Sequence, residues 1–168
     1  MKKGQIWVET VLYTVIIISI ITLILALTIQ SINKQKDEAI VAQSIDALNT
    51  MDQKIKDVSH DTGNVRIVDF NLRKGKLFIS GKNDTITLMI NDLGDPYSQP
   101  DIELNEGNVK ILTTQGPKKS SVNLTLKYNF NMTYDGNDEE VAFSQASTAY
   151  KFSIENSKTI DIREVSQG

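Results

Sequence analysis

The chain has 168 residues, with 18 lysine and arginine residues against 21 aspartate and glutamate residues, and a formal net charge of −3. This balance, without a basic stripe interleaved with aromatic residues, excludes a typical nucleic-acid-binding surface. A single histidine and the lack of cysteine exclude the commonest imidazole and thiolate metal sites. Apolar residues form a block in the first 30 positions and follow regular patterns in the polar remainder, which predicts a molecule of two parts.

The first predicted element starts with an uncharged run at residues 11–29, VLYTVIIISIITLILALTI. At about 1.5 Å per residue, such a run spans the hydrocarbon core of a membrane. It is longer than the apolar part of a typical cleaved secretory signal, and no small-x-small cleavage site follows it. Lysines flank it on both sides, so counting charges does not set its orientation. We expect a signal anchor whose N-terminus lies in the cytoplasm.

The same helix is predicted to continue well beyond the membrane block. After Gly4 no glycine or proline occurs before Gly63, so residues 5–62 are compatible with one unbroken helix. Apolar residues at three- and four-residue steps predict one apolar face that covers the rest of the chain: Ile40, Val41, Ile45, Leu48, Met51, Ile55 and Val58. Residues of opposite charge, spaced four apart, are expected to pair on the solvent-exposed face of the helix: Lys34 with Glu38, and Asp52 with Lys56.

From residue 64 onward the apolar period changes from 3.6 to 2, which predicts strands. The clearest case is residues 121–133, SVNLTLKYNFNMT, interpreted as one long strand with one buried face. Further strands are predicted between turn signals at residues 65–72, 76–80, 85–90, 102–104, 109–113, 150–154 and 159–163. The predicted fold class is therefore α+β, with a long helix packed on an antiparallel β sandwich or barrel.

Candidate sites in the β-rich part are few. Three N-x-[ST] sequons, at Asn83, Asn123 and Asn131, are candidate N-glycosylation sites, and the last two lie on the predicted outward face of the long strand. Residues 135–140, DGNDEE, offer oxygen ligands without the spacing of an EF-hand, so a solvated loop tip is the preferred interpretation. His60 lies near the helix end, where a cation suits the dipole. With no catalytic constellation or phosphate loop, we expect neither an enzyme nor a cofactor.

The N-terminal residues together resemble a type IV prepilin, and more narrowly the class III signal peptide of archaeal pilins. Lys2, Lys3 and Gly4 are followed by Gln5 and Glu9 inside an uninterrupted apolar helix. The archaeal pattern is Gln-x-Ser-x-Glu with a Leu four residues on, and Gln5 and Glu9 match it. In this chain Trp and Tyr stand at the Ser and Leu positions. The glutamate favours an adhesion-type pilin over a motility filament.

The resemblance implies a division of the chain and a set of partners. Residues 1–4 would be a leader removed by a prepilin peptidase, which cuts after Gly4. Residues 5–62 would be the long helix, with 11–29 in the membrane or filament core and 30–62 amphipathic, and residues 63–168 an extracellular head. The implied partners are further copies in a helical homopolymer, the peptidase, a membrane assembly platform with its ATPase, and the membrane before assembly. No nucleic acid is expected.

The placement of Glu9 agrees with this resemblance. A glutamate in the membrane costs roughly 2.5–3.5 kcal/mol on insertion scales. Cleavage after Gly4 would create an α-ammonium at Gln5, one helical turn from Glu9, and in packed helices the two charges would pair within or between subunits. Such a pair specifies axial register more than it adds stability. Small residues on one face would allow close helix approach: Ser19, Thr22 and Ala26.

Two alternatives stay open at the level of sequence. One is a single-pass, membrane-anchored surface or binding protein that does not polymerise, which needs neither the spacing from Gly4 to Glu9 nor a continuous helix. The other is a minor pilin or pseudopilin of a secretion or uptake system. Sequence alone does not separate the latter from a major pilin.

Overall fold

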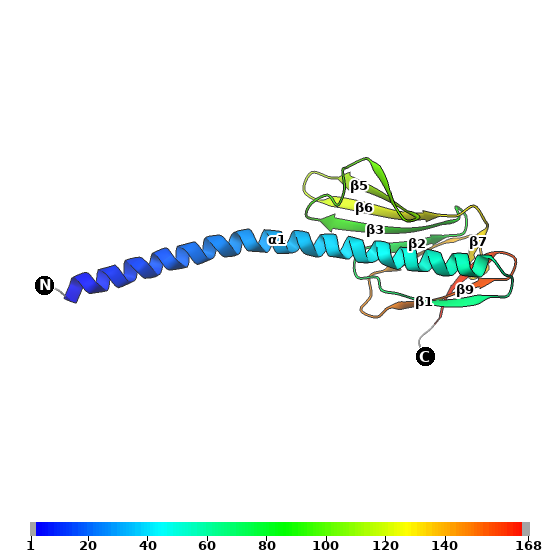
Figure 1. Cartoon of the computed structure of the whole chain (residues 1–168), viewed down its shortest axis with the longest axis horizontal. Helices are drawn as coiled ribbons and strands as arrows, with labels where there is room; N and C mark the ends of the chain where they lie inside the picture. Colours follow the sequence, from blue (N-terminus) through cyan, green and yellow to red (C-terminus); the bar gives the residue numbers. More distant parts are fainter. Residues whose placement is uncertain (1–2, 166–168) are drawn as a thin grey trace. The chain divides into compact units, whose positions relative to one another are not determined.

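The computed structural model describes residues 3–165, which form one long helix followed by ten strands (Figure 1). Side chains are described for residues 7–26, 28, 29 and 31–165. By its internal contacts the chain forms two compact units that divide between Lys36 and Asp37, inside the helix. We call the described residues up to Lys36 the N-terminal segment, and those from Asp37 onward the head unit. The sequence-based division at residues 62 and 63 instead follows the change of secondary structure.

Helix α1 (Lys3–Ser59) is unbroken over 57 residues, which confirms the predicted continuous helix. It ends three residues earlier than predicted, because the head unit caps it. The side-chain amide of Asn156 donates to the carbonyl oxygens of Val58 and Ser59, at 3.1 and 3.4 Å. Gly63, at φ +87°, then turns the chain into the first strand.

The strands of the head unit form two sheets. The strands are β1 (Val65–Phe70), β2 (Lys76–Ser80), β3 (Thr85–Leu93), β4 (Glu103–Glu106), β5 (Val109–Gln115), β6 (Ser120–Lys127), β7 (Met132–Tyr134), β8 (Glu140–Ser144), β9 (Tyr150–Asn156) and β10 (Ile160–Glu164). The six-stranded sheet has the order β4-β5-β6-β3-β2-β8 and is antiparallel throughout. The four-stranded sheet has the order β1-β9-β10-β7. Its pair β10–β7 is parallel, so the prediction of a purely antiparallel head is wrong at this one pair.

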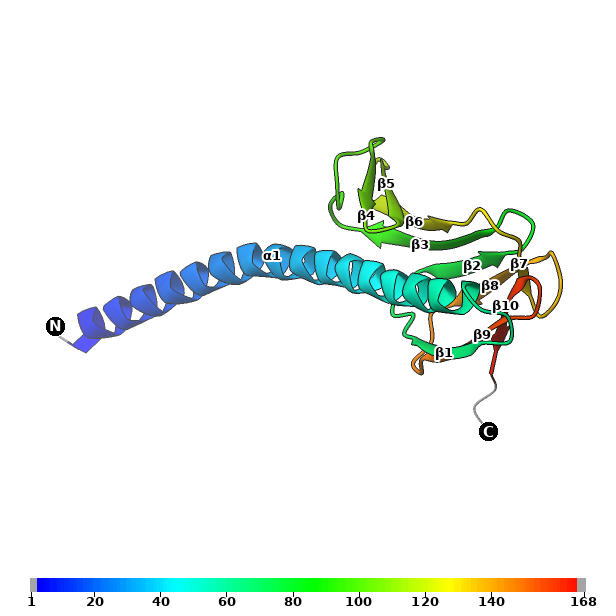
Figure 2. The same ribbon diagram turned by 45° about the vertical axis from the view of Figure 1, so that its right-hand side comes forward.

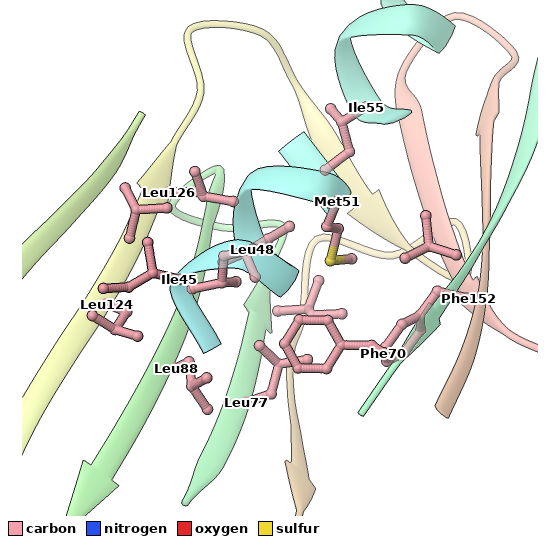
Figure 3. Close-up of a cluster of buried hydrophobic side chains, with 14 of the residues drawn as sticks. Ile45, Leu48, Met51, Ile55, Phe70, Leu77, Leu88, Leu124, Leu126 and Phe152 are labelled. Atoms are coloured by element: carbon pink, nitrogen blue, oxygen red, sulfur yellow. The ribbon is translucent and has the colours of Figure 1, made fainter. Parts of the chain in front are cut away.

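The second half of α1 supplies part of the core between the sheets. Figures 1 and 2 show the cyan half of the helix running between β2 and β3 on one side and β1 on the other. The predicted apolar face is confirmed: its residues from Val41 to Val58 are fully buried, and Ile40 is partly buried. They pack with side chains of both sheets, among them Leu88, Leu124 and Phe152 (Figure 3). The α+β layout expected from the change of period is therefore present.

The long strand predicted at residues 121–133 is wrong as one element. The chain forms β6, leaves the six-stranded sheet, and resumes as β7 in the other sheet. The carbonyl oxygen of Asp84 accepts the N–H of Tyr128 at 3.0 Å, in register with the β3–β6 pairing, and its carboxylate accepts the N–H of Met132 at 2.8 Å, where β7 begins. Tyr128 and Met132 are both buried, so the alternation of apolar residues continues through the connection.

Other strand boundaries moved by smaller amounts. β3 extends to Leu93 through a register shift after Ile90, and the predicted strand at 102–104 lies at β4. β8 was not predicted, because only Phe143 of its five residues is fully buried and its alternation is weak.

Candidate functional site

The N-terminal segment presents apolar side chains on every side. The large apolar residues described between Trp7 and Ile32 are 44–75 % exposed. By length and composition this helix is able to cross a membrane. Water is an unfavourable environment for so much contiguous apolar surface, because each square ångström removed from water contributes about 25 cal/mol. The segment therefore requires lipid or protein around it.

The predicted processing and assembly residues lie at the start of this segment. Lys3, Gly4 and Gln5 belong to the first turn of α1 by their backbone, and Lys2 falls outside the described residues. Glu9 has an exposed side chain one turn further on. Residues four apart lie on the same side of a helix, so Gln5 and Glu9 share a face.

Four hydroxyl groups along the segment form hydrogen bonds within the helix itself. Thr14, Ser19, Thr22 and Thr28 each donate to the carbonyl oxygen four residues earlier, at 2.8 Å. These polar atoms thus demand no partner from lipid or from a neighbouring helix. The face predicted to allow close approach of a second helix also contains Ala26. Because its hydroxyls bond to the backbone, this face presents small apolar groups to its surroundings.

Sequence reasoning missed a hollow on the helix surface beside Trp7. Trp7, Val8, Val11, Leu12 and Val15 line an apolar depression of about 280 Å³. Four of these residues follow the i, i+3, i+4, i+7 spacing that forms a hole for a side chain of a facing helix. The sequence signal was present as spacing, but Trp7 was considered only as a departure from the pilin pattern.

The start of the head unit is fixed by Asp37, which sequence reasoning also missed. Its carboxylate accepts a hydrogen bond from Lys74 Nζ at 2.9 Å and another from the N–H of Gly94 at 2.8 Å. Lys74 Nζ also donates to the carbonyl oxygen of Asp92 at 3.1 Å. Burial raises the pKa of Asp37, but the hydrogen bonds from Gly94 and Lys74 outweigh it, so the pKa lies below its ordinary value. We call Asp37, Lys74 and Gly94 the Asp37 clip.

One of the two predicted charge pairs on the helix forms, although the prediction that it lies on the solvent-exposed side is wrong for Asp52. Asp52 meets Lys56 at 2.8 Å and is buried, and it also accepts a hydrogen bond from the amide of Asn108 at 2.7 Å. The buried hydroxyl of Tyr128 lies beside Asp52. Burial, together with the negative charge of Asp52, raises the pKa of Tyr128 far above its ordinary value. Lys34 and Glu38 are both exposed, and they are not among the ion pairs of the described residues.

The three sequons occupy different surroundings. Asn83 is exposed in the turn between β2 and β3, and Asn131 is exposed in the connection between β6 and β7. Asn123 lies in the middle of β6 and is half-buried, with its side-chain oxygen buried and without a hydrogen-bond partner. A glycan would therefore fit at the first two positions with less rearrangement than at Asn123.

The acidic loop 135–140 is held at its base by Asp161. This buried carboxylate accepts hydrogen bonds from Thr133 Oγ1 at 2.8 Å, the N–H of Gly136 at 2.7 Å and Arg163 Nε at 2.5 Å. These bonds, opposed by burial, keep the pKa of Asp161 below its ordinary value. Within the part of the chain that the structure describes, no group of three acidic, histidine or cysteine side chains is placed to hold a metal ion. His60 is exposed just beyond α1.

Comparison with protein-family models, with curated proteins and with solved structures gave no match. The geometry itself offers two features with functional meaning: an apolar helical segment that needs a covering, and a folded head unit whose core includes the continuation of the same helix.

Proposed function

We propose that this chain is the structural subunit of an extracellular, type IV pilus-like filament that serves surface adhesion. In this proposal it is made as a membrane-anchored precursor, cleaved after Gly4, and polymerised through its apolar helix. The partners are further copies of the chain, the prepilin peptidase, and the membrane assembly platform with its ATPase. The proposed role is structural rather than enzymatic.

The observation that carries the proposal is the continuity of α1. One helix of 57 residues serves as an exposed apolar segment in its first half and as a core element of the head unit in its second half. A simple anchor needs about 20 apolar residues and no rigid connection to the domain that it tethers. A helix that continues without a break into the core of the head unit supports a different use, in which the apolar segment packs in an assembly and the head is built on the same helix.

Glu9 supports the same proposal, because a carboxylate among apolar side chains carries a free-energy cost that a partner charge would offset. It is the only acidic residue before Asp37, and it lies among side chains that would face lipid or neighbouring helices. The proposed cleavage creates an α-ammonium at Gln5, on the same face one turn away, and this charge offsets that of Glu9. Pairing between neighbouring subunits would set their axial register.

The first experiment is N-terminal mass spectrometry of the protein recovered from its host's surface. A mature chain that begins at Gln5 is expected. A surface chain that still begins at Met1 would refute the proposed processing and would favour the non-polymerising membrane-anchored protein.

The second experiment separates a filament subunit from that alternative. Glu9→Gln is expected to abolish surface filaments seen by electron microscopy, while the chain still accumulates in the membrane. Glu38→Gln, an exposed change on the same helix, is the matched control and should leave filaments intact. Normal filaments from Glu9→Gln would contradict the proposal. The amount of this chain in sheared filaments then distinguishes a major subunit from a minor pilin or pseudopilin.

A further inference from the structure

An exposed acidic strip lies at one edge of the six-stranded sheet. Among the described residues strand β4 pairs with β5 alone, and all four of its residues are exposed. Leu104 and Glu106 share one face of the strand, and Ile102 precedes them by one step of the same two-residue period. Ile102 and Leu104 are 43 % and 44 % exposed. We call Ile102, Leu104 and Glu106 the acidic strip.

The charge around the acidic strip is strongly negative. Residues 94–107 contain four acidic residues and no lysine or arginine. One of the four, Glu103, is neutralised by Lys110 at 2.7 Å. Among the described residues Glu106 enters no ion pair, so an excess of negative charge remains beside two uncovered apolar side chains.

A strip of the opposite charge lies near the C-terminal end of the N-terminal segment. Ile29, Ile32 and Lys36 are spaced i, i+3, i+7, so they share one face of α1. All three are exposed, the isoleucines by 57 % and 44 %. Lys34 adds a second exposed cation, and neither lysine forms an ion pair with a described residue. We call Ile29, Ile32 and Lys36 the basic strip.

The two strips match in order and in length. Each has two apolar side chains followed by one charge, and the charges are opposite. The basic strip covers seven helical steps, about 10 Å, and the acidic strip covers four extended steps, about 13 Å. A helix laid against the face of β4 that carries Leu104 and Glu106 would place Ile29 and Ile32 against Ile102 and Leu104. The same placement would bring Lys36 toward Glu106.

We propose that the basic strip of one copy docks on the acidic strip of a second copy. The inference rests on the proposed filament, because that assembly supplies the second copy. The two strips are different surfaces, so the contact is heterologous and is able to continue from subunit to subunit without closing. Complementarity on both sides favours a second copy over anionic lipid, which would pair with the lysines and leave the acidic strip uncovered.

Cysteine cross-linking tests this contact directly, since the natural chain contains no cysteine. Ile32 and Leu104 have the same exposed fraction, 44 %, so neither substitution opens a core. Filaments of the double variant Ile32→Cys, Leu104→Cys are expected to give a ladder of covalent oligomers after mild oxidation. Co-expression of the two single variants should give dimers alone. The matched control, Ile32→Cys with Ile67→Cys, pairs the helix with an exposed position on β1 of the other sheet and should give neither.

Charge exchange tests the electrostatic part. Lys34→Glu with Lys36→Glu should speed the disassembly of sheared filaments at low salt by about two- to five-fold for each lost pair. In a second chain, Lys36→Glu combined with Glu106→Lys exchanges the one proposed charge pair and should restore the wild-type rate. Lys118→Glu, an exposed change in the β5–β6 turn, should have no effect.

The outcomes separate this contact from the filament itself. Wild-type filaments whose cysteine variants give no ladder would overturn the contact and leave the proposed function standing. A chain that forms no filaments and keeps Met1 would overturn the proposed function. The contact is also wrong if charge exchange fails to restore the rate while the lysine variants lose binding to vesicles of phosphatidylglycerol, since the lysines would then face lipid.

Discussion

Replacing Asp37 by asparagine should loosen the start of the head unit. The carboxylate accepts two hydrogen bonds, one of them from a charged amine, and its side chain and that of Lys74 are only 20 % and 25 % exposed. Breaking a fully buried ion pair costs about 3–5 kcal/mol, and an exposed pair contributes about 0.2–1 kcal/mol. Because the asparagine oxygen still accepts one hydrogen bond, we expect a loss of about 2 kcal/mol in the free energy of unfolding.

Thermal unfolding of the full chain in detergent micelles measures this loss. For a head unit of this size, about 2 kcal/mol corresponds to a decrease in Tm of ~6–10 °C. Lys74→Met should cost a similar amount, and the double variant should cost less than the sum, with a coupling of about 1 kcal/mol. Asp138→Asn, an exposed change in the acidic loop, serves as the control. Additive effects of the two clip variants, or an unchanged Tm for Asp37→Asn, would refute the role assigned to the clip.

Three further changes test the head unit with the same unfolding measurement. Because the pKa values of Asp37 and Asp161 are lowered by folding, their stabilisation is present above the unfolded value of about 3.9 and is lost as the pH falls through the folded values. Stability should therefore stay level from pH 7 to about 5 and fall below about 4, with a shallower fall for Asp37→Asn; an equal slope would contradict this. Met51→Ala, at a position with no exposure, should cost about 2–5 kcal/mol, and a smaller cost would mean that the core collapses around the site. Gly75→Ala combines a φ of +94° with a clash against a backbone carbonyl and should cost about 3 kcal/mol, whereas Gly63→Ala, at φ +87° in open space, should cost about 1–2 kcal/mol.

Local periodicity predicted the helix well because both of its halves carry strong signals. The uncharged run marks the first half, and apolar steps of three and four residues mark the second, from Val41 to Val58. The end of α1 was misplaced by three residues, because the cap comes from Asn156, nearly a hundred residues later. Such a contact leaves no trace in the sequence around the helix end.

The errors in the sheets have one physical origin. A two-residue period reports which side chains are buried, and it does not report which sheet buries them. Tyr128 and Met132 continue the alternation of β6, but the chain changes sheet between them, and the Asp84 carboxylate accepts the N–H of Met132 where β7 begins. The parallel pair β10–β7 is equally invisible, because it depends on where the chain returns after leaving the first sheet.

Two features of the candidate site were missed from the sequence, and they differ in whether neighbouring or distant residues form them. The hollow beside Trp7 is formed by residues 7–15 of one helix, so its spacing was readable from the sequence. The Asp37 clip joins Asp37 to Lys74 and Gly94, which lie 37 and 57 positions later in the chain, and no local pattern around Asp37 indicates these partners. Only the folded chain brings Lys74 and Gly94 to it.

The position of the Asp37 clip explains how one helix serves two environments. Up to Lys36 the described apolar side chains are exposed, and from Val41 onward the apolar face is fully buried. A helix pulled by its N-terminal segment would tend to peel from the head unit at this boundary, where few apolar contacts hold it. The clip places an ion pair and a backbone hydrogen bond there, from two separate loops, and thereby resists peeling at its first step. Under the proposed function, heads of Asp37→Asn filaments should therefore open under shear at a lower force than wild type, which faster cleavage of the sheared heads by an added protease would report.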